Sequence, residues 1–591
     1  MRRDWQGLPS WQILDTRFLH GQLFLKTWRD WQHTPDRPGV LHVVALCNTP
    51  PDAQALRQAC DEDPSLLPLA NELITHWFGL LPGFHRFLLA NGQVSLTLCV
   101  GDALQTLRQQ TFFADEVVLT LNETAHPGEF DAHDTWAVKA LARCCRRGTT
   151  LHCHLPTGAE TTTLQHQLRA NGFATRQESL PTIDDAKAVL QACFDPPWTL
   201  KTSRQTHRVA LPIQRCAVIG AGLAGASVAA ALARRGWQVQ VLDAAPAPAA
   251  GASGLPVGLV VPHTSSDDCP LSRLSRAGVR LTLQQAQQHL QQSSQWAACG
   301  VLERQVGGTP QLPLHWPSAG EDWSASAPDK LADGPGLWHP KAAWIKPAAL
   351  VRAWLSQPGV HFQGNAQVSH LQQAGGIWQL LDEHHRVLCT AERVVFANAA
   401  GARVLLDTLA TTTPALATQL AQLPATQGMR GLLSWALHSE SSASETAFPP
   451  FPVNGFSGLV ARVPTEHGRA WFMGSSYQPE QQVERPDADN HSRNLDHLQQ
   501  LLPSLAAPLA ATFASDRLHT WKGTRCISAD RLPLVGPLDA SEQPSLWLCA
   551  ALGSRGLSFS VLCAELLAAQ MGAEPLPVEA KLAKALHALR A

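Results

Sequence analysis

Three glycines at a fixed spacing follow a short apolar stretch near the middle of the chain. Residues 216–219 predict a buried strand, and Gly220, Gly222 and Gly225 come directly after it, ahead of an alanine-rich run typical of a helix. In this pattern the first glycine makes a tight turn, the second lets a pyrophosphate approach the backbone, and the third lets the helix pack on the strand. The feature predicts a strand–turn–helix unit of the Rossmann type, with an empty glycine turn as the alternative.

A second strand and an acidic residue complete the pattern. Residues 238–242 predict the next strand, and Asp243 ends it 18 residues after Gly225. A carboxylate at this position accepts hydrogen bonds from a ribose, and the helix N-terminus after the glycines favours phosphate. The order of strand, turn, helix, strand and acid therefore predicts a dinucleotide site.

Two further glycine clusters favour a flavin over a nicotinamide dinucleotide. The first contains Gly251 and Ser253 and follows the second strand. The other precedes a helical stretch at residues 557–570 and consists of Gly553, Ser554, Arg555 and Gly556. Backbone N–H groups at a helix start stabilise the negative charge of reduced flavin. A surface turn that caps a C-terminal helix is the alternative for the second cluster.

The chain divides by pattern into two parts and a linker. Residues 1–195 alternate predicted strands, at 40–46, 94–100 and 116–121, with helical segments, which indicates a parallel sheet. Residues 196–214 are polar and predict a linker, and residues 215–591 form the part with the glycine turn. The glutamine-rich run 284–295 is expected to be a solvated helix face.

Charge and cysteine content exclude several classes of protein. The chain has 46 Lys and Arg against 48 Asp and Glu, so net charge does not draw it to nucleic acid or a membrane. Its 14 cysteines include no CxxC pair, which argues against a metal site or a disulfide framework. The first residues lack the apolar run of a signal peptide. We therefore expect a cytoplasmic protein with no metal and no membrane association.

The C-terminal part resembles the flavin-dependent amine oxidases of the glycine, sarcosine and D-amino acid oxidase group. The resemblance rests on residues 393–401, on Gly523-Thr524-Arg525 and on residues 530–536. The whole chain is similar to the family of bifunctional tRNA 5-methylaminomethyl-2-thiouridine biosynthesis proteins. That similarity adds residues 251–254, 429–431 and 550–557 and, in the N-terminal part, residues 81–86 with Gly101 and Asp102.

The resemblance implies an α/β fold of two domains. The first is a Rossmann-like domain of the methyltransferase type. The second is a flavin-binding Rossmann domain with an inserted antiparallel α+β substrate domain. The FAD part is expected mainly at 215–300, 390–405 and 520–591, and the substrate part roughly at 300–390 and 405–520.

The implied reaction is a two-step change to a tRNA wobble uridine. The FAD domain removes the carboxymethyl group from a 5-carboxymethylaminomethyl side chain, and the other domain methylates the freed amine with S-adenosylmethionine. Arg525 matches the arginine that binds the substrate carboxylate in the oxidase group, and a structural salt bridge is its alternative. Tyr477 is the only tyrosine of the chain and lies in a stretch that resembles one near the substrate, although a core tyrosine is equally consistent with the sequence.

The N-terminal part departs from its family in the loop that approaches S-adenosylmethionine. Residues 16–24 stand where the family has a glycine-rich loop, and Arg17 and Leu19 carry side chains there while Gly21 is kept. A β-carbon obstructs both the turn and the ligand. Asp102 can have an adenine-side role or be a turn residue. The departure predicts a domain that keeps its fold and has lost methyl transfer.

Contact with tRNA is predicted from the resemblance alone. Two small basic patches, Arg143 with Arg146 and Arg147, and Lys201, Arg204 and Arg208 with Arg215, suit phosphate contacts or simply form solvated faces. Two other functions stay open. One is a free amino acid oxidase of the glycine or sarcosine type, and the other is a flavin-free scaffold that binds tRNA.

Overall fold

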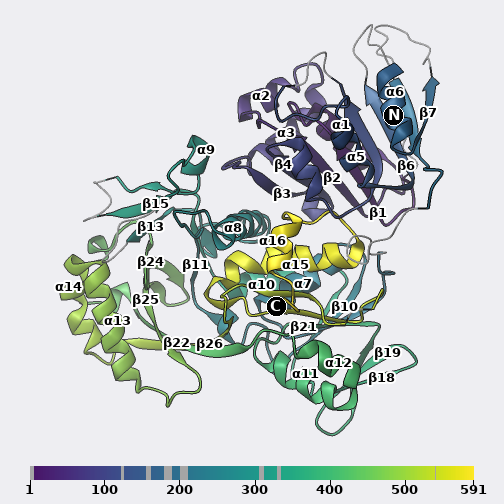
Figure 1. Ribbon diagram of the computed structural model, residues 1–591. Coiled ribbons are helices and arrows are strands. Elements are labelled where there is room, and N and C mark those ends of the chain that lie inside the picture. The colour runs from purple at the N-terminus through teal and green to yellow at the C-terminus, as the bar shows by residue number, and fades with distance from the viewer. Residues whose placement is uncertain are drawn as a thin grey trace. The chain divides into compact units, whose positions relative to one another are not determined.

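The computed structural model describes residues 5–121, 126–154, 162–178, 189–199, 210–304, 312–328, 335–539 and 541–590 (Figure 1). The chain forms two compact units. The first comprises Met1–Ile213, Arg234–Gly236 and Ala568–Lys584, and the second comprises Gln214–Ala233, Trp237–Leu567 and Ala585–Ala591. Two short segments of the predicted domain 215–591, Arg234–Gly236 and Ala568–Lys584, therefore belong to the first unit. Lys201, Arg204 and Arg208 of the predicted linker lie outside the described residues.

An eight-stranded sheet forms the centre of the first unit. Its order is β3 (Gly83–Leu89), β4 (Val94–Val100), β2 (Val40–Cys47), β1 (Ser10–Asp15), β5 (Ala114–Thr120), β6 (Cys145–His154), β8 (Val189–Phe194) and β7 (Phe173–Glu178). The five strands from β4 to β6 are parallel, and β3 and β8 run antiparallel to their neighbours. Strands β2, β4 and β5 correspond to the three strands predicted from sequence. The strand order reverses between β1 and β5, where a parallel sheet of this kind binds ligands.

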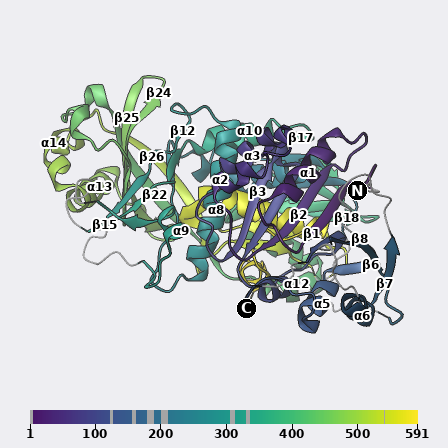
Figure 2. The same cartoon turned by 90° about the horizontal axis from the view of Figure 1, so that it is seen from above.

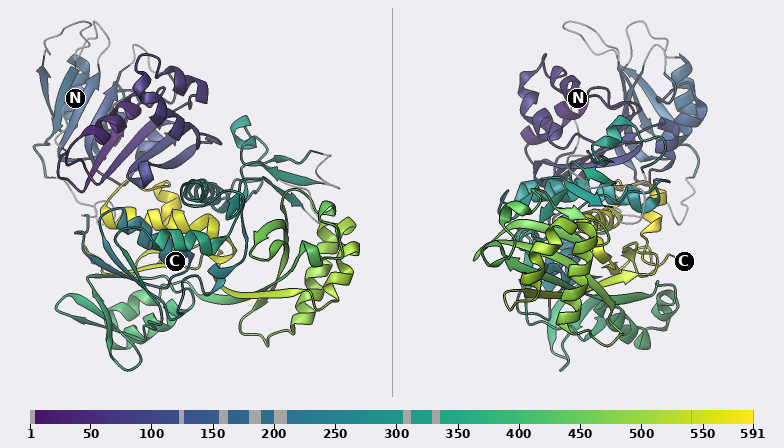
Figure 3. Two further views of the ribbon diagram at one scale, coloured as in Figure 1. Left: turned by 180° about the vertical axis from the view of Figure 1, so that it is seen from behind. Right: turned by 90° about the vertical axis from the view of Figure 1, so that its left-hand side faces the viewer.

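Helices cover both faces of this sheet (Figure 3). The apolar residues alternate along each strand, so that Ile13 of β1 packs with one set of helices and Leu14 with the other. One face carries α1 (Gln22–His33), α2 (Ala53–Gln58) and α3 (Leu67–Ile74), and the other carries α4 (Ala103–Arg108), α5 (Thr135–Ala142) and α6 (Thr162–Ala170). The runs of consecutive apolar residues in the central strands follow from burial on both faces.

A buried ion cluster joins three segments of the first unit. The Glu574 carboxylate lies 3.2 Å from His42 Nε2 of β2 and 2.9 Å from Arg235 Nη2, and all three side chains are almost fully buried. Burial alone would raise the pKa of Glu574, but the neighbouring charges of Arg235 and His42 outweigh it and bring the pKa to about 2. Burial also lowers the pKa of His42. The carboxylate is therefore stabilised as an anion in the folded protein.

We expect Glu574→Gln to destabilise the first unit and to remove part of its acid sensitivity. Breaking a buried pair by removing one partner costs about 3–5 kcal/mol. Because the folded pKa is depressed, the stabilisation is complete above the unfolded pKa of about 4.3 and is lost as pH falls towards 2. Thermal unfolding from pH 2 to 7 checks this, with the exposed Glu62→Gln as control. Equal pH dependence in Glu574→Gln and the native protein would contradict it.

The second unit contains a six-stranded sheet that holds the glycine turn. Its order is β17 (Val360–Gln363), β10 (Gln238–Leu242), β9 (Arg215–Ile219), β21 (Arg393–Phe396), β28 (Leu546–Ala550) and β27 (Leu534–Pro537). All neighbouring pairs are parallel except β27 with β28. From β9 the chain continues first to β10 on one side and later to β21 on the other, so the strand order reverses between β9 and β21. The carboxyl ends of these two strands form the crevice in which such sheets bind ligands.

Layers lie on both faces of the six-stranded sheet. Figure 1 shows α7 (Leu223–Ala233), α10 (Pro347–Leu355) and α15 (Gly556–Gly572) on one face. The other face packs against α11 (Gly401–Thr412), α12 (Pro414–Leu420) and a small sheet of β18 (His370–Ala374), β19 (Ile377–Leu381) and β20 (Val387–Ala391). The remaining elements of the unit's FAD side include the 20-residue helix α8 (Pro270–His289) and a sheet of β11 (Gly258–Val260), β16 (Ala343–Ile345) and β12 (Trp296–Ala297). The tail carries α16 (Ala580–Ala585).

A second large sheet in this unit provides the substrate side. Its order is β14 (Ala325–Ser326), β15 (Gly336–His339), β13 (Val301–Arg304), β23 (Val453–Asn454), β24 (Gly458–Thr465), β25 (Gly468–Pro479), β22 (Thr426–Leu437) and β26 (His519–Ser528). Helices α13 (Asp487–Leu501) and α14 (Pro503–Phe513) cover one face (Figure 2). The short helix α9 (Ser318–Glu321) precedes β14.

Several sequence predictions need correction. The substrate sheet is not purely antiparallel, because β13 and β23 are parallel. Strand β17 completes the edge of the FAD-side sheet, although residues 300–390 were expected on the substrate side, while β26 joins the substrate sheet. In α8, Gln284 and Gln285 are buried rather than solvated, and Gln285 accepts a hydrogen bond from Trp354. Strands of four residues and buried amides with one tertiary partner leave little signal in a sequence.

Candidate active site

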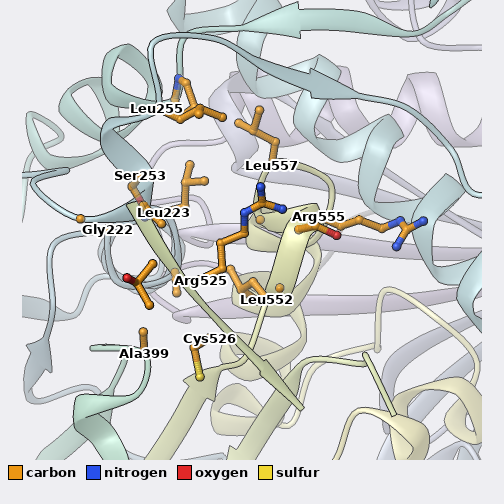
Figure 4. Close-up of a pocket in the computed structure, with 18 of the residues that line it drawn as sticks. Gly222, Leu223, Ser253, Leu255, Ala399, Arg525, Cys526, Leu552, Arg555 and Leu557 are labelled. Carbon is orange, nitrogen blue, oxygen red and sulfur yellow. Dashed lines mark hydrogen bonds between the residues drawn. The ribbon is translucent and has the colours of Figure 1, made fainter. Parts of the chain in front are cut away.

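A cavity of about 1410 Å³ opens within the second unit, at the carboxyl ends of β9 and β21, and extends to the substrate sheet. Eleven of the twelve residues predicted from sequence line it: Gly220, Gly222, Asp243, Gly251, Ser253, Tyr477, Arg525, Gly553, Ser554, Arg555 and Gly556. The twelfth, Gly225, lies on α7 behind the turn. In Figure 4, Gly222 and Leu223 lie on one side of the cavity, and the Arg555 side chain points away from the Arg525 guanidinium.

The glycine turn leaves no room for β-carbons. Gly220 has φ +105°, and a Cβ there would meet Ala397 O of the neighbouring strand end at 2.8 Å. A Cβ on Gly225 would lie 1.8 Å from Gly220 O, so α7 packs on the turn only because this residue is glycine. A Cβ on Gly222 would meet Ser253 Oγ at 2.9 Å. Gly220 and Gly225 are therefore needed for the turn and for the packing of α7 on it, and the lack of a side chain at Gly222 leaves room for Ser253 Oγ.

Polar groups already organise the turn. Asp243 accepts hydrogen bonds from Ala221 N at 2.6 Å and from Ala245 N at 2.9 Å, so its carboxylate holds the turn as well as facing the cavity. Ser253 Oγ accepts from Leu223 N at 2.9 Å, at the first residue of α7. These contacts fix the backbone at the helix start, where phosphate is favoured.

The cavity also contains polar atoms that lack partners. Within the described residues, Asn398 Oδ1 and Ser457 Oγ are buried without a hydrogen-bond partner, and both residues line the cavity. Buried polar groups in folded proteins are normally satisfied. Asn398 Cα lies 2.9 Å from the place of a Cβ on Gly220. The orphaned oxygens, the closely packed turn and the start of α15 at Gly556 together fit FAD.

Arg525 and Tyr477 meet on the substrate side. Arg525 Nη2 donates to Tyr477 OH and to Ser475 Oγ, the latter at 3.4 Å, and its guanidinium lies 4.3 Å from the centre of the tyrosine ring. In the part of the chain that the structure describes, no carboxylate pairs with Arg525, which argues against a structural salt bridge. Tyr477 is 39 % exposed and is therefore not a core residue.

Sequence reasoning missed a polar group at another wall of the cavity. Glu303 of β13 lines the cavity and lies 3.1 Å from the buried His339 Nε2. Burial acts to raise the pKa of Glu303, but the hydrogen bond from His339 and nearby positive charges lower it overall. Burial lowers the pKa of His263, which lines the same wall. Glu303 lies in a four-residue strand whose pairing with β15 is not visible in the sequence.

Two further findings concern metals and membranes. Among the described residues, no three His, Cys, Asp or Glu side chains gather in a way that could hold a metal ion. None of the helices in the described ranges combines the length and the apolar character needed to cross a membrane. All 14 cysteines of the chain lie in described segments and are free thiols.

The C-terminal part matches a family model and is similar to solved structures. Residues 215–570 match the family model described as FAD dependent oxidoreductase, so the second unit is of the class of FAD-dependent oxidoreductases. The crystal structure of glycine oxidase from Geobacillus kaustophilus matches 61 % of this chain and 95 % of its own, with 17 % identity and a TM-score of 0.46.

Close relatives extend over the whole chain. The tRNA 5-methylaminomethyl-2-thiouridine biosynthesis bifunctional protein MnmC of Albidiferax ferrireducens is 50 % identical over 99 % of this chain and 94 % of its own length. The protein of that name from Polaromonas naphthalenivorans is 44 % identical over 98 % and 90 %. The chain therefore belongs to the MnmC family.

Proposed function

We propose that the second unit oxidises the 5-carboxymethylaminomethyl side chain of a tRNA wobble uridine and leaves a 5-aminomethyl group. The relatives' name concerns the biosynthesis of 5-methylaminomethyl-2-thiouridine in tRNA. The observation that carries the proposal is one cavity that joins a dinucleotide turn to the Arg525 guanidinium, which lacks an acidic partner among the described residues. A guanidinium is the donor that best fits a carboxylate.

FAD supplies a two-electron acceptor for hydride when it is bound at this turn. Arg525 binds the substrate carboxylate, and Ser475 and Tyr477 hold the guanidinium in place. The methylene between carboxylate and amine then gives up hydride, and the amine loses its proton to form an imine. Water adds to the imine and the C–N bond breaks, so glyoxylate leaves and the primary amine stays on the uridine. Positioning is the main task of the chain's residues.

The direct test measures glyoxylate released from tRNA that carries the carboxymethylaminomethyl group. We expect release from this tRNA with a kcat/KM far above that for glycine or sarcosine. Oxidation of the free amino acids without oxidation of tRNA would identify a free amino acid oxidase. A purified protein without flavin absorbance that binds tRNA would identify a scaffold. Either result would refute the proposal.

For the first unit we propose that S-adenosylmethionine does not bind. At the reversal between β1 and β5, the loop after β1 carries Arg17, whose Nη2 lies 2.9 Å from Glu129 Oε1, with both side chains about four-fifths buried. Leu19 has φ +51°, a backbone conformation that favours glycine. Arg17 and its partner thus occupy space beside the loop where a nucleoside cofactor needs open backbone.

The polar groups around this crevice are also committed. On the FAD side, Asp243 follows the second strand. The corresponding strand of the first unit, β2, ends in the buried Cys47 and is followed by Asn48, so this strand end offers no carboxylate to a ribose. Asp102 accepts from Gln105 N at 2.8 Å and caps α4, which supports the turn interpretation of this residue. Asp15 is fully buried, and burial raises its pKa to about 7.

Equilibrium binding of labelled S-adenosylmethionine to the FAD-loaded protein tests this second proposal. We expect no saturable binding up to millimolar concentration and no methyl transfer to aminomethyl-uridine tRNA. Saturable binding of one cofactor per chain would refute it. Flavin content and far-UV circular dichroism of the same sample show that both units are folded.

We propose tRNA as the partner and the cytoplasm as the location. Support from the predicted basic patches is weak, because Arg146 pairs with Asp115 and Arg147 pairs with Asp195. Free thiols throughout the chain suit a reducing compartment. The side chains beside Arg525 in the cavity support a nucleic-acid substrate more strongly.

A further inference from the structure

Two glycines leave an open floor beside Arg525. Gly431 of β22 and Gly523 of β26 are direct partners in the sheet, so neither strand has a side chain at this point. Tyr477 of β25 is the partner of Gly431 on its other side. A Cβ on Gly431 would lie 3.4 Å from both Tyr477 Cε1 and Ser475 Cβ. The two residues that hold the Arg525 guanidinium therefore gather at one end of this floor.

The indole of Trp521 lies at the other end. Trp521, Gly523 and Arg525 alternate along β26 and share one face of the strand. A Cβ on Gly523 would lie only 2.4 Å from Trp521 Cη2 and 3.0 Å from Cζ2, so the ring extends over the glycine. The ring is half-buried, lines the cavity and stacks on no other ring of the described residues. An aromatic face next to a binding cavity is thus left without a ring partner.

The spacing of these groups matches a modified pyrimidine. Positions two residues apart along a strand are about 7 Å apart, and paired positions on neighbouring strands are about 5 Å apart. The indole over Gly523 and the groups around Gly431 are therefore separated by about 5–7 Å. A carboxymethylaminomethyl arm measured from the centre of its pyrimidine ring to the carboxylate carbon is about 6 Å long by ordinary bond lengths. A base stacked on Trp521 would therefore place the carboxylate of its arm at Arg525.

We propose that Trp521 is the stacking platform for the target pyrimidine and the residue that selects a nucleobase substrate over a free amino acid. This inference rests on the proposed function, because it assigns the base of the same substrate. Gly523 is required because any side chain there would lift the indole from the strand. Stacking on an aromatic ring needs no positive charge on the protein, so it suits a chain with a net charge of −2.

The test compares Trp521→Ala, Trp521→Phe and Gly523→Ala as FAD-loaded enzymes. Substrates are tRNA bearing the carboxymethylaminomethyl group and N-ethylglycine, a carboxymethylamine without a base, and glyoxylate is measured. Because base stacking on an aromatic side chain contributes roughly 5- to 150-fold to affinity, we expect Trp521→Ala to raise KM for tRNA by such a factor. Trp521→Phe should restore KM to within about threefold, and Gly523→Ala should behave like Trp521→Ala. For N-ethylglycine, which has no base to stack, the change in kcat/KM of these variants should be much smaller than for tRNA.

Thr520→Ala is the matched control, since Thr520 is the neighbour of Trp521 and contacts His491 instead of the cavity. An unchanged KM for tRNA in Trp521→Ala, or a fall in kcat on both substrates with unchanged KM, would overturn the platform. The salt dependence of KM should be the same in Trp521→Ala and native enzyme, because stacking neutralises no phosphate. If the native enzyme releases no glyoxylate from tRNA, the proposed function fails. If the native enzyme is active and Trp521→Ala gives either of the two results above, the platform alone fails.

Discussion

Arg525→Ala is expected to lower kcat/KM for the carboxymethylaminomethyl substrate by roughly 10²- to 10⁴-fold, because it leaves a substrate carboxylate in the cavity without its charged partner. The guanidinium has Ser475 Oγ and the Tyr477 hydroxyl as its described partners, so its remaining donors are available to a ligand. Steady-state glyoxylate release at saturating FAD measures the effect.

Two variants separate charge from geometry at this position. Arg525→Lys keeps the positive charge but loses the planar fork of donors, so its kcat/KM should fall between those of native enzyme and Arg525→Ala. Tyr477→Phe removes one hydrogen bond to the guanidinium and should lower kcat/KM roughly 10- to 150-fold, as the loss of one hydrogen bond to a charged group does. Full activity of Arg525→Ala with normal KM would show that another group binds the carboxylate.

Gly225→Ala is expected to abolish FAD binding. The added Cβ would lie 1.8 Å from Gly220 O, a backbone atom that cannot yield as a side chain can, so α7 has to move away from the turn. The helix N-terminus and the turn then no longer face the same phosphates. Flavin absorbance per chain of the purified variant, before and after incubation with excess FAD, measures the loss.

Gly222→Ala tests the approach of the ligand to the backbone separately from the packing of α7 on the turn. Its Cβ would meet only Ser253 Oγ, at 2.9 Å, and a flexible side chain can yield. The double variant Gly222→Ala/Ser253→Ala removes this contact, and Ser253→Ala alone is its reference because Ser253 Oγ also accepts a hydrogen bond from Leu223 N. We expect the double variant to have the thermal stability of Ser253→Ala and to bind FAD at least tenfold more weakly than Ser253→Ala, which reports the approach of pyrophosphate to the backbone. Native FAD affinity in both Gly225→Ala and the double variant would contradict a dinucleotide at this turn.

The local part of the site was predictable because its residues are close in sequence. Gly220, Gly222 and Gly225 follow one strand and Asp243 ends the next, so spacing alone defines a turn, a helix start and an acid. The two predicted strands around them correspond to β9 and β10. Arg525 and Tyr477 have no such local signal and were identified through the family resemblance.

The rest of the site depends on register between strands that are far apart in the sequence. Nothing near Gly523 indicates that Gly431 is its partner, because 91 residues separate them and the pairing of β22 with β26 decides it. The contact of Glu303 with His339 likewise requires β13 to pair with β15. Burial of Gln284 and Gln285 reflects tertiary packing that overrides a polar composition.

The most direct test of the account is nucleoside analysis of modified tRNA after incubation with FAD-loaded protein, oxygen and S-adenosylmethionine. We expect the 5-carboxymethylaminomethyl nucleoside to be replaced by an equal amount of 5-aminomethyl nucleoside, with one glyoxylate per nucleoside and no methylated product. Unchanged 5-carboxymethylaminomethyl nucleoside in the presence of flavin-loaded protein would contradict it.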